Sequence, residues 1–84
     1  MTYMEQFEIG AIGSDSDYIA VYDGLFTDFI SMRINDSEAY CGATYNFSDA
    51  GEIKDLIKIL IKGLMTADDK DGLKEILEIL KQQL

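Results

Sequence analysis

The sequence predicts an α+β fold in which a four-stranded antiparallel sheet packs on two C-terminal helices, in the order ββββαα. Up to about residue 47 the apolar residues alternate as they do in strands, and short turn-forming links separate the segments. After residue 47 the apolar residues recur with helical spacing. With 84 residues, 48% of them apolar, the chain has the size of one acidic domain spanning 1–84.

Four segments in the first half have the composition of strands joined by turns. Asp23-Gly24 lies between two β-prone runs and is a strong signal for a tight hairpin, because such turns need positive φ angles. Consecutive strands with short links usually pair with their neighbours, so we expect an antiparallel meander. The expected strands are 3–12, 17–22, 25–34 and 38–47.

Alternation along these strands predicts two different faces of the sheet. Ile19 and Val21 share the face that we expect to form the core, and the opposite face carries Tyr18 and Tyr22. Asp28 has the parity of the core face, which predicts a bulge or an edge position near it. The other expected core residues are Phe26, Ile30, Met32, Ile34, Cys41, Ala43, Tyr45 and Phe47.

Two amphipathic helices are predicted after Phe47. Ser48 or Asp49 is the expected N-cap, and Asp49 followed three residues later by Glu52 has the spacing of a capping box. Apolar residues then recur every three or four positions from 53 to 64 and again from 73 to 84. Ile59 and Ile79 lie off these apolar stripes, so we expect them to be exposed and count them as candidate contacts of a homodimer.

The charge of the chain excludes several classes of function. Its net charge is −9 and it contains no histidine. Such a charge repels nucleic acid and anionic membranes, so we expect neither as a direct partner. Without an imidazole, which titrates near neutral pH, an acid–base enzyme is not expected. The charge is also uneven, because residues 1–49 hold nine acids and only one base, Arg33.

No feature of the sequence requires a cofactor. The single Cys41 cannot form an internal disulfide or a metal cluster by itself. The segment 67–72 is acidic and distantly similar to a calcium-binding loop, but a solvated link between two helices is the favoured interpretation. No signal peptide or membrane-length apolar run is present, so we expect a cytoplasmic protein.

The expected binding surface combines carboxylates with the tyrosines of the non-core face. Carboxylates two residues apart on an extended strand are about 6.6 Å apart, close to the spacing of phosphates along a nucleic-acid strand. Tyrosine is enriched in protein interfaces, although cross-strand aromatic pairs can also serve only to stabilise a sheet. The candidate partner-binding residues are Asp15, Asp17, Tyr18, Tyr22, Asp23, Asp28, Asp36, Glu38 and Tyr40.

The order of elements and several short segments resemble the small phage-encoded anti-CRISPR proteins. The likeness runs over roughly 17–80, and the segments that carry it are Tyr18–Gly24, Ile30–Ile34, Gly42-Ala43, Phe47–Asp49 and Gly72-Leu73. It implies binding to a multi-subunit CRISPR surveillance complex, with a contact tyrosine at Tyr22. An acidic contact of the family falls on Asn35 here, which is a departure. The high acidity is similar to that of anti-CRISPR proteins that mimic DNA phosphates.

The sequence therefore favours a stoichiometric inhibitor without catalysis or cofactor. Its expected target is a basic protein or ribonucleoprotein, such as a CRISPR effector complex in a bacterial host cell. The alternative is an antitoxin or immunity protein that neutralises a basic toxin or nuclease. A structural or metal-binding module is a third possibility.

Overall fold

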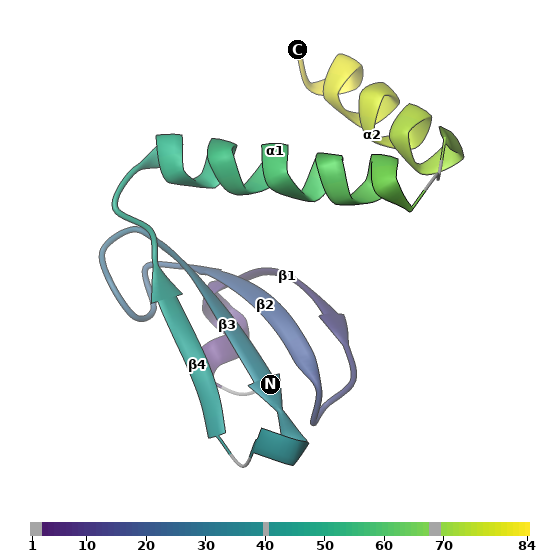
Figure 1. Cartoon of the computed structure of the whole chain (residues 1–84). Coiled ribbons are helices and arrows are strands. Elements are labelled where there is room, and N and C mark those ends of the chain that lie inside the picture. The colour runs from purple at the N-terminus through teal and green to yellow at the C-terminus, as the bar shows by residue number, and fades with distance from the viewer. Residues whose placement is uncertain (1–2, 40, 68–69) are drawn as a thin grey trace. The chain divides into compact units, whose positions relative to one another are not determined.

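The computed structural model describes residues 3–39, 41–67 and 70–84, and it divides the chain into two compact units, Met1–Ala50 and Gly51–Leu84. The first unit contains a four-stranded antiparallel sheet, and two helices follow it along the chain (Figure 1). The predicted ββββαα order is thus confirmed. That the whole chain acts as one domain stays a prediction.

The sheet is the predicted antiparallel meander. Each strand pairs with its neighbour in sequence, in the order β1-β2-β3-β4, and every pair is antiparallel. A bulge between Glu8 and Gly10 shifts the register of the first pair. The strands are β1 (Glu8–Gly13), β2 (Tyr18–Asp23), β3 (Ile30–Asp36) and β4 (Cys41–Asn46).

The first expected strand is partly wrong. Its first five residues form a 3-10 helix, η1 (Tyr3–Phe7), and β1 begins only at Glu8. A second short 3-10 helix, η2 (Ser37–Ala39), likewise replaces the beginning of the last expected strand. Apolar alternation over so few residues does not distinguish an extended strand from a tight helical turn.

The expected tight hairpin is also wrong, because β3 begins at Ile30 and not at Leu25. Gly24 has the positive φ expected of a turn, at 79°, but its N–H bonds the carbonyl of Phe29 at 3.1 Å and closes a longer loop. In this loop the Phe26 ring meets the Tyr22 ring edge-on, with centroids 5.5 Å apart. Asp28 lies in this loop and not in a strand, so the bulge or edge position that we expected near it is wrong.

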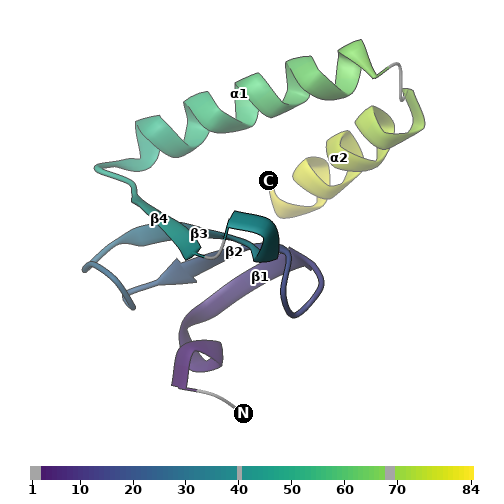
Figure 2. The ribbon, with the colours of Figure 1, turned by 60° about the horizontal axis from the view of Figure 1, so that its bottom comes forward.

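The buried residues of the sheet unit come mostly from the face that we expected to be open. Ala20, Tyr22 and Ser31 are 1%, 4% and 0% exposed, whereas Ile34 and Tyr45 of the expected core face are 43% and 51% exposed. The expectation that Tyr22 lies on an open face of the sheet is therefore wrong, whereas its role in binding a partner stays a prediction. The reason is that η1 and the loop after Gly24 lie against this face, and Figure 2 shows η1 below the strands.

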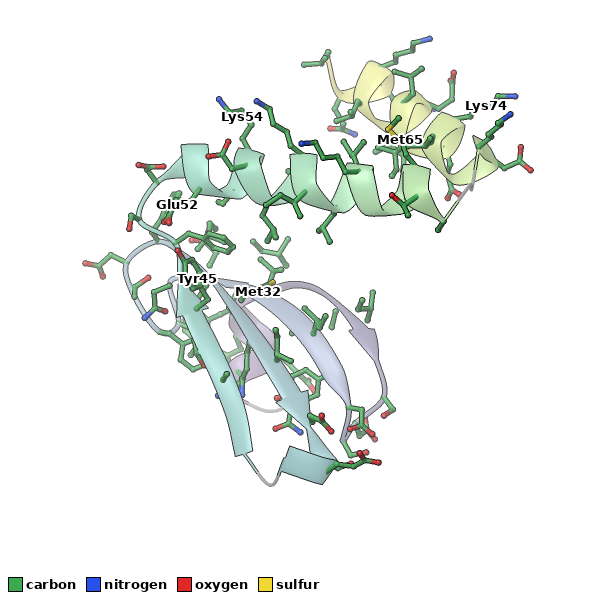
Figure 3. The ribbon with its side chains drawn as sticks, viewed as in Figure 1. Met32, Tyr45, Glu52, Lys54, Met65 and Lys74 are labelled. Carbon is green, nitrogen blue, oxygen red and sulfur yellow. The ribbon has the colours of Figure 1, made fainter. Side chains whose placement is uncertain are left out.

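Side-chain hydrogen bonds join β4 to β3, and an aromatic contact lies at the end of β4. The buried Ser31 hydroxyl and Asn46 Oδ1 are 2.8 Å apart across β3 and β4. Phe47 is buried as expected, and its ring packs edge-on against Tyr45. Tyr45 pairs with Met32 on the face opposite Tyr22, where Figure 3 shows both side chains.

The helical unit consists of α1 (Ala50–Thr66) and α2 (Lys70–Gln83). The first helix begins directly after Asp49, one of the two residues expected to cap it. Neither helix contains a buried residue in the part of the chain that is described, and Ile59 and Ile79 are exposed as predicted. Neither described helix is both long and apolar enough to cross a membrane.

Substitution of Gly13 provides a test of the turn between β1 and β2. Its φ is +103°, and a Cβ at this position would collide with the carbonyl of Asp17. We expect Gly13→Ala to destabilise the protein by about 1–3 kcal/mol in urea unfolding, because a non-glycine residue is strained there. Gly10→Ala is the matched control: a Cβ there meets nothing within 4 Å, so its effect should be below about 0.5 kcal/mol. Equal losses would contradict this account of the turn.

An acidic groove lined by tyrosines as the candidate functional site

The sheet unit contains a groove between η1 and the strands β1 and β2. Its volume is about 380 Å³. It includes three of the predicted binding residues, Asp15, Tyr18 and Tyr22. The lining residues are Met4, Glu5, Glu8, Ala11, Ile12, Gly13, Ser14, Asp15, Tyr18 and Tyr22.

The pairing of β1 with β2 explains why this face is hollow. Gly13 lies opposite Tyr18, and Ala11 lies opposite Ala20, so β1 presents little side-chain volume beside the first tyrosine. Two positions on from Ala20, Glu8 is the cross-strand partner of Tyr22. Small residues on one strand next to tyrosines on the other leave a space, and Met4 and Glu5 of η1 border it.

Carboxylates give the groove a negative potential. Glu5, Glu8 and Asp15 all line it and are all exposed, and none of its lining residues is a lysine or arginine. A hollow lined by one sign of charge, next to protein of low dielectric constant, focuses the field and attracts cations. The groove is thus suited to a positively charged group.

Tyr22 forms the buried wall of the groove. Burial raises the pKa of its hydroxyl, and the nearby Tyr18 and Glu8 add to this effect while Arg33 opposes it. The phenol therefore stays neutral over the physiological range, and its oxygen can both donate and accept a hydrogen bond.

Tyr18 is held in place by Arg33, the one base of the sheet unit. The Arg33 side chain donates from Nε to the Tyr18 hydroxyl at 3.3 Å and from Nη1 to Thr44 Oγ1 at 3.1 Å. These bonds join β2, β3 and β4 on the groove face of the sheet. The strand parity that Arg33 shares with Tyr18 places both on one face of the sheet, and it is the signal in the sequence for this contact.

Asp17 has a structural role that the sequence did not indicate. Its Oδ1 accepts hydrogen bonds from the Ser37 N–H at 2.8 Å and from the Ser37 hydroxyl at 3.0 Å. These two bonds, the backbone one first, lower the pKa of the Asp17 carboxyl below its ordinary value. Asp17 therefore fastens the turn before β2 to the start of η2.

The other predicted residues do not join the groove. Asp23 and Asp28 are exposed on the β2–β3 side of the unit, and Asp36 and Glu38 are exposed around η2, where Asp36 accepts the Glu38 N–H at 3.0 Å. Tyr40 lies outside the described residues. Three of the predicted residues thus line one groove, and the other described ones are carboxylates scattered over the surface.

Met4, Glu5 and Glu8 were not among the predicted binding residues, because the segment that holds the first two was expected to be a strand. The described residues contain no group of three or more metal-ligating side chains suited to a metal ion. Comparison of the chain with protein-family models, curated proteins and solved structures yields no match.

The Asp17–Ser37 contact predicts a pH-dependent loss of stability. Because folding lowers the Asp17 pKa, the carboxylate stabilises the fold above its unfolded pKa of about 3.9 and loses this effect as the pH falls through the folded value. Asp17→Asn should therefore be less stable than wild type at about pH 6, and the difference should shrink at about pH 2.5. Urea midpoints at both pH values measure it.

The charge-matched control is Asp23→Asn, since the Asp23 carboxylate accepts no hydrogen bond from any described residue. This variant should not reproduce the dependence on pH. A stability difference for Asp17→Asn that stays constant between the two pH values would contradict the role of the charge.

Proposed function

We propose that this protein is a stoichiometric inhibitor of the anti-CRISPR type. It binds a nucleic-acid-guided bacterial nuclease or surveillance complex and covers the basic surface that grips nucleic acid. The proposal involves no catalytic step.

The observation that carries the proposal is the exposure of acid in the sheet unit. All nine of its carboxylates are exposed, from Glu5 to Asp49. Its one base, Arg33, is half-buried and donates to Tyr18 and Thr44. The helical unit differs, because its lysines nearly balance its acids. Negative charge is thus concentrated on the small sheet unit.

Such a surface favours a partner that normally binds phosphates. Channels for nucleic acid are lined by lysine and arginine, and their affinity is dominated by charge. A densely acidic protein is attracted to such a channel at long range, which raises the association rate. The tyrosine-lined groove adds a shaped feature that a bare phosphate chain lacks. The resemblance to anti-CRISPR proteins supports the same class of target.

Charge reversal on the sheet unit tests this function. The variant Asp15→Lys, Asp23→Lys, Asp28→Lys should bind a purified CRISPR surveillance complex at least about tenfold more slowly than wild type at low salt. Asp17 is left unchanged because it accepts two hydrogen bonds from Ser37. Wild-type association should also slow as salt rises, since screening acts over about 8–10 Å. Biolayer interferometry measures both rates, and competition with target DNA measures the inhibition.

The matched control reverses three exposed carboxylates of the helical unit, Asp55→Lys, Asp71→Lys and Glu75→Lys. It changes the net charge equally and should slow association less than about threefold if the sheet unit forms the contact. Equal losses in both triple variants would contradict a surface located on the sheet. A complex that still binds DNA when saturated with the protein would contradict the inhibition. Selective binding to a basic toxin would favour the antitoxin alternative instead.

A further inference from the structure

We infer that the groove receives an arginine side chain of the partner, whose guanidinium bonds to the Tyr22 hydroxyl and the Glu8 carboxylate. The inference rests on the proposed function, because a basic partner supplies the arginine. It adds to that function a specific contact, since charge mimicry by itself needs no particular side chain.

The first observation is a phenol with an unused hydrogen-bonding group. Tyr22 is only 4% exposed, and its hydroxyl makes no hydrogen bond to any described residue. Yet no fully buried polar side-chain atom in the described part of the chain lacks a partner. Because the Tyr22 hydroxyl has no such partner, it must keep contact with solvent. Tyr22 lines the groove, so we place this contact there. Its ring is buried and its oxygen is left for a ligand.

The second observation is the charge around this oxygen. Glu8 is the cross-strand partner of Tyr22, and its negative charge acts on the phenol more strongly than the positive charge of Arg33 does. Glu5 and Asp15 line the same groove. An anion would be repelled here, and the described carboxylates do not form a cluster that could hold a metal ion. The remaining candidate is an organic cation.

The guanidinium of arginine fits this arrangement better than the ammonium of lysine. It has five N–H donors in one plane and lies flat against aromatic rings, so it can bond separate acceptors at once. The protein already contains such a contact, because Arg33 donates from Nε to the Tyr18 hydroxyl. The groove volume of about 380 Å³ is ample for one side chain.

The test uses the full chain and a blocked Gly-Arg-Gly peptide, followed by NMR titration of backbone amides. The arginine peptide should shift the signals of Glu8, Tyr18 and Tyr22. The citrulline peptide has the same shape without the charge and should bind at least about tenfold more weakly. The lysine peptide should also bind more weakly, because it is a point charge. Equal binding of arginine and citrulline, or of arginine and lysine, would overturn the inference.

Two variants locate the contact. Tyr22→Phe keeps the buried ring and removes only the hydroxyl, so binding of the arginine peptide should weaken at least about fivefold. Glu8→Gln should have a similar effect and does not disturb the ring. Tyr45→Phe, on the opposite face of the sheet, is the matched control and should bind as wild type does. Melting temperatures of all three verify folding.

The outcomes separate this inference from the proposed function. A folded Tyr22→Phe protein that binds the arginine peptide like wild type overturns the arginine site. If the arginine peptide fails to bind but the charge-reversed sheet variant associates with the surveillance complex more slowly than wild type, the proposed function stands without the arginine site. If the peptide binds as expected but charge reversal has no effect on the complex, the proposed function fails and the groove remains a site for arginine.

Discussion

The burial of the Tyr22 ring is the interaction on which the sheet unit depends. A ring of this size loses most of its contact with water only if something lies on it, and here Phe26 packs edge-on against it while η1 borders the same face. Next to it the buried Ser31 hydroxyl is satisfied by Asn46. Aromatic burial of this kind contributes more than any surface contact in so small a unit. The loop after Gly24, which is longer than a tight hairpin turn, supplies Phe26 to this contact.

The same packing creates the groove. β1 carries Gly13 and Ala11 beside the tyrosines of β2, so the face is covered only at one end, by η1. The Tyr22 oxygen then lies at the boundary between core and solvent, with Glu8 next to it. In the arginine site that we propose, Tyr22 stabilises the fold through its ring and binds the partner through its hydroxyl.

The carboxylates of the sheet unit have two different roles. Asp17 accepts two bonds from Ser37 and Asp36 accepts one from Glu38, so these acids hold the turns at one end of the sheet. Asp15, Glu8 and Asp23 carry their charge on the surface instead. All of them are exposed, but a count of acids does not tell which of them also stabilise the fold. Hydrogen bonds from the backbone distinguish the two kinds, and composition does not.

The sequence by itself determined the class of fold, the meander of four strands, the two helices and the concentration of acid in the first half. Period-two and period-3.6 patterns and turn residues are local, and local patterns act over the whole length of an element. Only the tertiary structure decided which face of the sheet is buried, where β1 and β3 begin, and which carboxylates meet the tyrosines. Alternation shows that Ile19 and Tyr22 lie on opposite faces, but both faces carry apolar residues. The face that becomes buried depends on where η1 and the loop that carries Phe26 pack, and neither position follows from the alternation of residues along a strand.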